Sequence, residues 1–430
     1  MTIKKPIAKS KKSKSTKSKA KPAARKSPRG TLRVLLLENI HTAAEQNFSS
    51  DKSRRVERYA GSPPEDDLLN LLPGVHVLGI RSKTQISDRV LNAAPQLIAL
   101  GCFCIGTDQV DMEAATRRGI AVFNAPFSNT RSVAELTIAE VVMLARRAVQ
   151  RSMELHGGRW QKSAVGCMEV RRKTIGIVGY GHIGPQVGLL AESMGMKVVF
   201  HDIIKKLPLG NARQLSGLEE LLKMSDFVTM HVPDTPLTRR MIGREQLRLM
   251  PKGSFLLNLS RGSVVDIRAL REALISGHLS GAAIDVYPKE PRSGKDPFES
   301  ELRGLDNVIL TPHIGGSTEE AQRNIGLEVS EALIEYMEAG SSAGSANMPE
   351  VQLPAIEDSC RILNIHRDVP GVLSRINGLV AGMSVNIKAQ SYNTRGGIGY
   401  LIMDVERNVS RNIETQIQYL DTSIRTRLLV

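Results

Sequence analysis

Residues 174–202 read TIGIVGYGHIGPQVGLLAESMGMKVVFHD, and this stretch decides the fold of the chain. Its first five residues, TIGIV, are mostly apolar and predict a buried strand. Three glycines follow in the spacing G-x-G-x-x-G, namely Gly179, Gly181 and Gly184. A helix is expected over 183–194, and a second strand over 197–200 leads to Asp202. Strand, glycine turn, helix, strand and acid in this order are typical of a doubly wound α/β domain.

The glycine turn predicts a dinucleotide site. The first glycine allows the tight turn, the second lets a diphosphate approach the backbone, and the third lets the helix pack on the strand. The diphosphate would lie at the helix N-terminus. Asp202 falls where a carboxylate binds the ribose hydroxyls and would repel a ribose phosphate, so NAD is expected rather than NADP. Lys205 and Lys206 lie close enough in the sequence to keep NADP open as an alternative.

The excess positive charge of the chain is concentrated at its N-terminus. The chain has 58 Lys and Arg against 44 Asp and Glu, a net charge of +14. Residues 1–30 hold twelve of the basic residues and no acid, which leaves 46 basic and 44 acidic residues elsewhere. This segment has hardly any large apolar side chain to bury, so we expect a disordered basic tail. Nucleic-acid binding is not favoured, while weak anionic contacts and an organelle transit peptide stay open as alternatives.

The sequence predicts neither a membrane span nor a metal site. No apolar run reaches the roughly 20 residues that a membrane helix needs. The four cysteines have no metal-ligand spacing, and two of them, Cys102 and Cys104, suit packing in an apolar strand. With no secretory signal recognised, the expected location is the cytoplasm.

Strand and helix patterns alternate along the chain and predict three domains. A first α/β domain, with no dinucleotide fingerprint and therefore free to bind substrate, is expected over 31–128 and 313–340. The dinucleotide domain covers 129–312, and a linker rich in Gly, Ser, Ala and Pro covers 341–357. A small α+β domain covers 358–430. The expected fold is thus two Rossmann-like parallel-sheet domains followed by a small α+β domain.

One long helix is expected at the start of the dinucleotide domain, over 131–153. Its first residues resemble a capping box, in which Ser132 or Thr130 caps the helix and Glu135 follows.

Polar residues follow the predicted strands of the dinucleotide domain, where ligands of an open parallel sheet bind. They include His231, Arg261, Asp285, Glu290 and His313. A histidine exchanges a proton near neutral pH, a neighbouring carboxylate favours its charged form, and a guanidinium can hold a carboxylate with two hydrogen bonds. This set suits hydride transfer between a 2-hydroxy acid and a nicotinamide. Each residue taken alone could equally be structural.

Four short motifs lie along residues 179–316. They are GYGHIG at Gly179–Gly184, LSRG at Leu259–Gly262, DVYPKEP at Asp285–Pro291 and TPHIGG at Thr311–Gly316. Together they resemble the D-isomer-specific 2-hydroxyacid dehydrogenase family, which implies that Arg261, Glu290 and His313 are catalytic. The resemblance also implies cofactor contacts at Gly179, Gly181, His182, Ile183, Gly184, Asp202, His231, Val232, Pro233, Leu259, Ser260, Arg261, Asp285, His313, Gly315 and Gly316.

Motifs outside the dinucleotide domain narrow the resemblance to one group within the family. They are GIRS at Gly79–Ser82, GCFCIGT at Gly101–Thr107, FNAPFSNTRS at Phe123–Ser132, and the segment 361–430, which resembles an ACT regulatory domain of the ferredoxin-like type. They are similar to family members that oxidise 3-phosphoglycerate to 3-phosphohydroxypyruvate with NAD, in L-serine biosynthesis. This implies a homotetramer, with substrate contacts at Arg81, Ser82 and Asn129. The resemblance leaves a second activity open, the reduction of 2-oxoglutarate to 2-hydroxyglutarate.

The same resemblance implies an L-serine effector site at His366, Asp368 and Asn386. Family members that bind serine typically carry Asn where this chain has Asp368. An ionised Asp accepts a hydrogen bond from the serine ammonium but repels the serine carboxylate. We therefore expect weak or absent inhibition by serine.

Two other functions stay open at this stage. The substrate could be a different D-2-hydroxy acid, above all 2-hydroxyglutarate, whose second carboxylate could take the place of the phosphate on Arg81. A protein of a different class, an NAD(H)-sensing regulator such as a transcriptional corepressor, could also retain all three catalytic residues.

Overall fold

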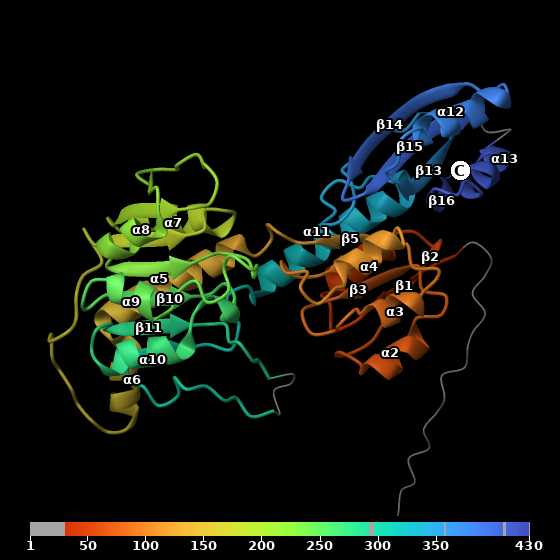
Figure 1. Cartoon of the computed structure of the whole chain (residues 1–430). Coiled ribbons are helices and arrows are strands. Elements are labelled where there is room, and N and C mark those ends of the chain that lie inside the picture. The colour runs from red at the N-terminus through yellow and green to blue at the C-terminus, as the bar shows by residue number, and fades with distance from the viewer. Residues whose placement is uncertain (1–30, 292–295, 357, 407–409, 430) are drawn as a thin grey trace, which may run out of the picture. The chain divides into compact units, whose positions relative to one another are not determined.

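The computed structural model describes residues 31–291, 296–356, 358–406 and 410–429, with only the backbone of residues 410 and 411 (Figure 1). The described chain contains three sheets. Two are entirely parallel and one is antiparallel, which confirms the predicted combination of two Rossmann-like domains and a small α+β domain. The predicted basic tail, residues 1–30, lies outside the described residues.

The first domain is built on a five-stranded parallel sheet in the order β2-β1-β3-β4-β5. Its strands are β1 (Leu32–Leu36), β2 (Arg54–Arg58), β3 (Val77–Ile80), β4 (Ala99–Cys102) and β5 (Ala121–Asn124). Its helices are α1 (Thr42–Phe48), α2 (Glu65–Leu71), α3 (Asp88–Asn92), α4 (Met112–Arg117) and α11 (Glu319–Ala339). Helices α1 and α11 share a core cluster with one face of the sheet, and α2, α3 and α4 share another with the opposite face.

The second domain carries a seven-stranded parallel sheet in the order β12-β11-β10-β9-β6-β7-β8. Its strands are β6 (Thr174–Val178), β7 (Lys197–His201), β8 (Arg213–Gln214), β9 (Phe227–Met230), β10 (Phe255–Asn258), β11 (Gly281–Ile284) and β12 (Val308–Leu310). Its helices are α5 (Thr130–Arg146), α6 (Ala148–His156), α7 (Ile183–Ser193), α8 (Leu218–Met224), α9 (Arg244–Leu249), the 3₁₀ turn η1 (Gly262–Val264) and α10 (Ile267–Ile275). Helices α5 and α7 cover one face, and α8, α9 and α10 cover the other. The strand order reverses between β6 and β9, and this switch point is where a doubly wound sheet binds its ligand.

The third domain has an antiparallel sheet in the order β14-β15-β13-β16, with two helices on one face. Along the chain its elements are β13 (Ser359–Arg367), α12 (Val372–Gly382), β14 (Ile387–Arg395), β15 (Ile398–Glu406), α13 (Ser410–Gln418) and β16 (Ser423–Leu429). This βαββαβ order is the ferredoxin-like arrangement that the sequence predicts for an ACT domain.

The prediction of one long helix over 131–153 is wrong, because two helices, α5 and α6, occupy this stretch. Arg147 separates them in the left-handed conformation, with a φ of 50°. The backbone N–H of Met168 donates to the carbonyl of Ala145 at 2.8 Å. One of the last carbonyl groups of α5 thus finds its hydrogen-bond donor outside the helix. The predicted capping box is also absent. Asn129 is the N-cap, and the Ser132 hydroxyl pairs instead with the Thr318 hydroxyl at 2.9 Å.

The segment predicted as a linker, 341–357, contains no helix or strand in its described part but is not loose. Ser342, Met348 and Val351 are buried. Residues 345–347 lie along β5: the N–H of Ala346 donates to the Val122 carbonyl at 2.8 Å, and the Val122 N–H donates to the Asn347 side chain at 2.8 Å. The segment therefore covers the edge strand of the first sheet, which its Gly, Ser and Pro content did not indicate.

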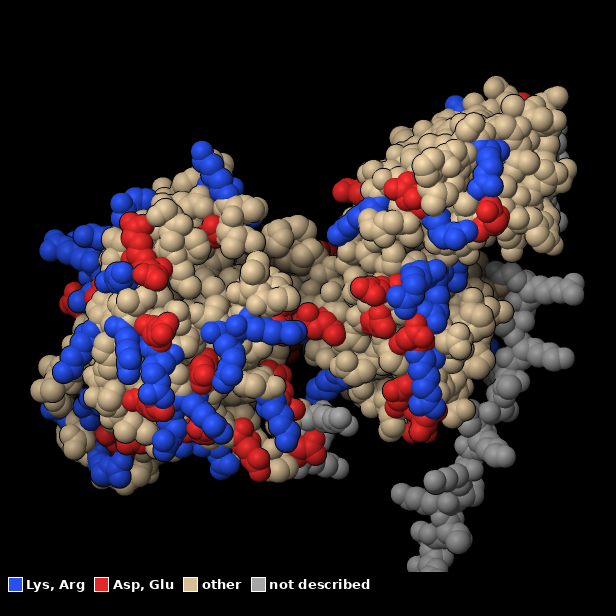
Figure 2. Space-filling model, in the orientation of Figure 1, with Lys and Arg blue, Asp and Glu red and all other residues tan. Residues whose placement is uncertain are grey.

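Charged side chains of both signs are interspersed on the face shown in Figure 2. This agrees with the nearly equal numbers of basic and acidic residues outside the first 30. Among the helices that the structure describes, none is long and apolar enough to cross a membrane.

Candidate active site and cofactor site

The three glycines of the fingerprint occupy positions with different steric demands. A Cβ on Gly179, whose φ is 90°, would lie 2.3 Å from the carbonyl oxygen of His231, and a Cβ on Gly184 would lie 2.5 Å from the carbonyl oxygen of Gly179. Around a Cβ on Gly181 no atom of the described residues, apart from its two chain neighbours, would lie within 4 Å. The first and third glycines thus permit close backbone packing, whereas the second leaves open space above the turn.

The open space adjoins the N-terminus of α7. Its N-cap residue, His182, makes no side-chain capping bond, so the first N–H groups of the helix have no cap. Uncapped N–H groups and the positive end of the helix dipole favour an anion at this point. The residues present therefore fit a dinucleotide diphosphate, which Gly181, His182 and Ile183 would hold.

Asp202 follows β7 and lies beside the glycine turn. Its Oδ2 accepts a hydrogen bond from the Tyr180 N–H at 2.8 Å, and its Oδ1 accepts one from the Ile204 N–H at 3.1 Å. The carboxylate thereby fixes the backbone of the glycine turn. Its position at the end of the second strand is the one that a ribose-binding acid takes in this fold.

The residues after β9 pack against the glycine turn. A Cβ on Gly179 would lie 2.8 Å from Cγ1 of Val232. The His231 Nε2 lies 3.0 Å from the Thr229 hydroxyl, and burial lowers the pKa of His231 to about 3. A histidine with so low a pKa is a poor proton acceptor at physiological pH, so His231 does not suit the role of the proton carrier. Thr238 donates its hydroxyl hydrogen to the carbonyl of Pro233 at 2.6 Å and closes the loop.

Arg261 follows β10 in a loop that Asn258 holds in shape. The Asn258 side chain accepts from the Ser260 N–H at 3.1 Å and donates to the Arg261 carbonyl at 2.9 Å. Leu259 and Ser260, the loop residues between β10 and Arg261, are buried. A Cβ on Gly262 would lie 2.0 Å from the Tyr287 carbonyl carbon, so glycine is required next to the arginine.

The imidazole of His313 pairs with Glu290. Nδ1 lies 2.9 Å from Oε2 and 3.0 Å from Oε1 of the carboxylate. The hydrogen bond with Glu290 is the largest influence on His313 and raises its pKa, although burial acts in the opposite direction. Burial alone would raise the pKa of Glu290, but the hydrogen bond and charge of His313 outweigh it and lower that pKa. The pair is therefore arranged to stabilise the imidazolium form.

Asp285 holds the loop that carries His313. Its carboxylate accepts hydrogen bonds from the Thr311 hydroxyl at 2.6 Å, the Ile314 N–H at 2.8 Å and the Gly315 N–H at 2.9 Å. Asp285 is only 1% exposed, so in this structure its carboxylate binds the loop and is not accessible to a cofactor. The clamp keeps His313 at a φ of 56°, an unusual conformation for a residue with a side chain.

A second buried acid lies near Asp285. Burial first, and the charge of Asp285 second, raise the pKa of Glu140 to about 8. Glu140 is therefore protonated at neutral pH. Glu140, the α5 acid near Asp285, therefore adds no second negative charge beside the carboxylate that holds the His313 loop.

Asn129, predicted to contact substrate, lies against the same loop. A Cβ on Gly316 would lie 2.4 Å from the Asn129 Nδ2, so glycine is needed there for the amide to approach. The amide oxygen is buried and has no hydrogen-bond partner among the described residues. A buried acceptor without a partner is exceptional in a folded protein, and it marks this position beside the His313 loop.

The other two predicted substrate residues, Arg81 and Ser82, follow β3 in the first domain. Their backbone is held by a residue that the sequence analysis missed: the Glu38 carboxylate accepts the Arg81 N–H at 3.1 Å. Glu38 directly follows the last apolar residue after β1, so the strand-end rule that selected Arg261 could have found it. Asn258 was missed because it is the last residue of a buried strand and its role depends on the loop that follows.

The predicted effector residues lie in the third domain. His366 is 1% exposed in β13, and its Nδ1 pairs with the Asn364 Oδ1 at 2.8 Å. Its Nε2 is buried without a partner among the described residues. Asp368 and Asn386 are exposed, and no hydrogen bond joins the three within the described part of the chain.

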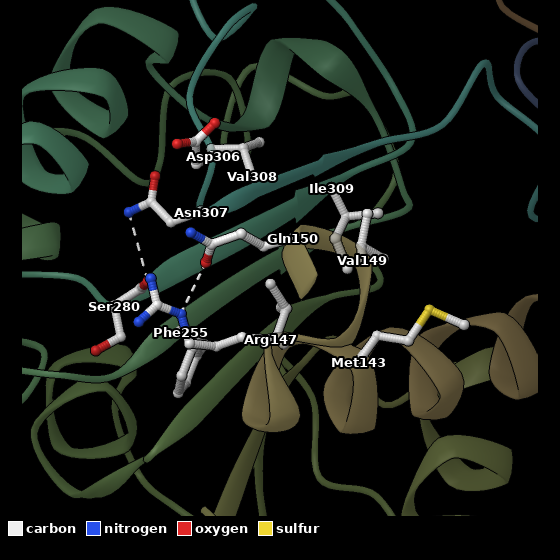
Figure 3. Close-up of a pocket in the computed structure, with 11 residues that line it drawn as sticks. Met143, Arg147, Val149, Gln150, Phe255, Ser280, Asp306, Asn307, Val308 and Ile309 are labelled. Atoms are coloured by element: carbon white, nitrogen blue, oxygen red, sulfur yellow. Dashed lines mark hydrogen bonds between the residues drawn. The ribbon is translucent and has the colours of Figure 1, made fainter. Parts of the chain in front are cut away.

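A shallow pocket lies away from the predicted site residues, where the end of α5 meets β12 (Figure 3). Arg147, at the break between α5 and α6, donates from Nε to the Gln150 amide oxygen at 2.8 Å. Met143, Phe255 and Ile309 supply apolar lining.

Comparisons with known proteins agree with this geometry. The model of the D-isomer-specific 2-hydroxyacid dehydrogenase NAD-binding domain matches residues 138–315, and that of an ACT domain like the AHAS small subunit matches 362–425. A D-3-phosphoglycerate dehydrogenase from Dictyostelium discoideum is 51% identical over 402 residues, which cover 94% of this chain and 98% of that protein. One from Escherichia coli strain K12 is 49% identical over 400 residues, covering 93% and 97%.

Solved structures show the same fold. The D-lactate dehydrogenase from Aquifex aeolicus, complexed with NAD and lactic acid, superposes with a TM-score of 0.62 at 27% identity and covers 71% of this chain and 95% of its own. The resemblance identified from the sequence motifs is therefore confirmed. The chain belongs to the D-isomer-specific 2-hydroxyacid dehydrogenases, and NAD is its cofactor.

Proposed function

We propose that the enzyme oxidises 3-phosphoglycerate to 3-phosphohydroxypyruvate, the first step of the phosphorylated route to L-serine. The observation that carries the chemistry is the His313–Glu290 pair with its 2.9 Å contact. The close relatives named D-3-phosphoglycerate dehydrogenase support the choice of substrate, because they match nearly the whole chain, including the first domain and the ACT domain.

His313 would act as the general base. Because Nδ1 is engaged by Glu290, Nε2 is the nitrogen free to accept the proton of the substrate 2-hydroxyl. Glu290 stabilises the imidazolium that results, and the same imidazolium can return the proton in the reverse reaction. When bound, NAD supplies the acceptor for the hydride that leaves C2.

Two arginines would hold the two anionic ends of the substrate. Arg261 would bind the carboxylate beside the reacting carbon, since its guanidinium can form two parallel hydrogen bonds with it. Arg81 would bind the phosphate, and its side chain has no hydrogen bond or ion pair with any residue that the structure describes. Ser82 and Asn129 would complete the contacts to substrate oxygens.

The test is a comparison of kcat/KM on 3-phosphoglycerate, D-2-hydroxyglutarate and D-lactate. We expect 3-phosphoglycerate to give the highest value, with Arg81→Ala reducing it far more than it reduces the value for D-lactate. D-Lactate has no second anion for Arg81 to bind. A wild-type enzyme with no turnover of 3-phosphoglycerate would overturn the proposal.

We also propose a homotetramer in which the second domains pair with each other and the ACT domains associate. Two observations on the second domain support its pairing with another copy. Helix α6 buries no residue of its own, and Trp160 and Val165 are 80% and 79% exposed in the segment after it. Met153 and Leu155 of α6 are exposed as well, and several exposed apolar side chains within one short stretch are typical of an interface. Light scattering should give four copies for the wild type and a smaller assembly for Trp160→Ser.

The ACT domain supports an effector role, and L-serine is the ligand that we propose for His366, Asp368 and Asn386. We also propose the cytoplasmic location that the sequence analysis expected, because it agrees with this metabolic role. Fractionation of cells that express the full chain tests it.

A further inference from the structure

We propose that Glu38 is a positioning residue for the substrate: its carboxylate fixes the backbone of residues 81–84 so that Arg81 and Ser82 are presented to the phosphate. This inference rests on the proposed function. It assigns a role to an acid that lies outside the sequence motifs of the family.

Three backbone N–H groups converge on the Glu38 carboxylate. Oε1 accepts from Arg81 at 3.1 Å and from Thr84 at 2.8 Å, and Oε2 accepts from Lys83 at 3.1 Å. Glu38 is 6% exposed, so these bonds are shielded from water. A carboxylate that receives several backbone N–H groups in this way is a charge-assisted anchor, and it fixes the shape of the loop that supplies them.

The backbone at Glu38 is itself unusual. Glu38 and Asn39 both lie in the left-handed region, with φ values of 56° and 52°. The Glu38 N–H donates to the Gly61 carbonyl at 2.9 Å and helps to hold this turn. Side-chain-bearing residues persist in this region when the surrounding structure over-determines it, and such positions cluster at functional sites. Here the turn directs the Glu38 side chain from the end of β1 to the loop after β3.

The other side of the Arg81 residue is held as well. Gln109 is 7% exposed, and its Nε2 donates to the Arg81 carbonyl at 2.7 Å. Glu38 and Gln109 thus fix the N–H and the C=O of the same residue from opposite sides. The guanidinium itself forms no hydrogen bond or ion pair with another described residue. The structure therefore fixes the base of the side chain and leaves its charged end for a ligand.

This arrangement reduces the ordering that substrate binding must supply. A loop held in its bound shape loses less conformational freedom on binding than a mobile one. Removing the anchor should therefore raise KM for a substrate that uses Arg81. It should leave the chemical step at His313 and the binding of NADH unchanged.

The informative variant is Glu38→Gln. A glutamine oxygen at the Oε1 position can keep the bonds from Arg81 and Thr84, but its NH₂ then faces the Lys83 N–H as a second donor. We expect KM for 3-phosphoglycerate to rise about tenfold, equivalent to about 1.4 kcal/mol, with kcat within a factor of about two. Glu113→Gln is the matched control, because Glu113 is an exposed acid of the same domain. It should leave all parameters unchanged.

A double-mutant cycle with Arg81→Ala separates positioning from general loss of structure. If Glu38 acts through Arg81, Glu38→Gln has little further effect on kcat/KM in the Arg81→Ala background. Equal fold-losses in both backgrounds would overturn the proposal. If the wild type turns over a different 2-hydroxy acid instead of 3-phosphoglycerate, the proposed substrate fails. The same cycle on the acid that it does oxidise then decides the role of Glu38.

Discussion

The Nδ1 atom of His313 lies 2.9 Å from the Oε2 atom of Glu290, and the two residues reach this distance from different loops of the second domain. Glu290 follows β11 and His313 follows β12, two neighbouring strands of the sheet. Because parallel strands end at the same edge, an acid and a base that are far apart in sequence meet there. This single contact raises the pKa of the histidine and determines which of its nitrogens is free.

Replacing His313 by alanine should reduce kcat by about 10² to 10⁴-fold, because general acid–base assistance is worth about that much. NADH binding, measured by fluorescence titration, should be retained. Lys289→Ala, which alters an exposed neighbour of Glu290, is the control and should keep wild-type kcat. A His313→Ala enzyme within about threefold of the wild type would remove His313 from the mechanism.

Replacing Glu290 by glutamine should change the pH profile in a defined direction. The carboxylate raises the pKa of His313, so its loss lowers that pKa. In the oxidation direction the base must be neutral, and the acidic limb of kcat/KM should therefore move to lower pH. In the reduction direction the imidazolium is needed, and the alkaline limb should also move to lower pH. A profile unchanged in both directions would contradict the assigned role.

Two glycine substitutions should separate cofactor binding from stability. Gly184→Ala places a Cβ 2.5 Å from the Gly179 carbonyl oxygen and should cost about 1–3 kcal/mol of unfolding free energy through overpacking. Beyond its chain neighbours, the new Cβ of Gly181→Ala meets no atom of the described residues within 4 Å, so Tm should be unchanged. Its methyl group would occupy the space assigned to the diphosphate, and the Kd for NADH should rise at least about tenfold. Equal NADH affinity in Gly181→Ala and wild type would place the diphosphate elsewhere.

Deleting residues 2–30 should leave kcat/KM and Tm unchanged. The sequence of this segment offers no packed surface, and its charges are screened beyond about 8 Å at physiological salt. Steady-state kinetics and thermal melts at two salt concentrations test this. A large loss of activity at low salt alone would show that the tail reaches the active site.

Serine should inhibit the wild type weakly and the Asp368→Asn variant more strongly. Asparagine supplies an N–H donor for the serine carboxylate, and one such bond to a charged group is worth roughly 1.5–3 kcal/mol, or about ten- to a hundredfold in affinity. The Asp368 N–H donates to the Gly397 carbonyl at 2.9 Å, a backbone contact that the substitution leaves intact. Serine titrations of both proteins at saturating NADH decide the point. Strong inhibition of the wild type with no gain in the variant would refute this view of the pocket.

The features predicted correctly from the sequence are those that depend on short stretches. The strand–turn–helix unit around Gly179 is specified within 29 residues, and the structure reproduces it as β6 and α7. The strand β2 shows the opposite case, because its sequence, RRVER, is polar and it lies at the edge of the first sheet. An edge strand that faces solvent can be polar throughout, as β2 is, and a polar strand has no apolar pattern to detect.

The features that the sequence did not predict depend on distant partners. Nothing near Arg147 in the sequence breaks the helical pattern. The break is stabilised by Met168, about twenty residues away. Likewise, Asp285 follows a strand as expected, but its role as the clamp of the His313 loop depends on donors from residues 311–315. Long-range hydrogen bonds of this kind have no local signature in a single sequence.

The segment 345–347 along β5 has a practical consequence for work on the ACT domain. Composition alone would suggest cutting the gene near Gly340 to obtain a catalytic fragment without its regulatory module. Such a cut would remove the Asn347 side chain and the Ala346 N–H from the edge of β5 and expose that strand to aggregation. A fragment that ends after Pro354 keeps both, along with the buried Val351. A loss of activity that the shorter fragment shows and the longer one does not would report the damaged edge of the sheet rather than the absence of regulation.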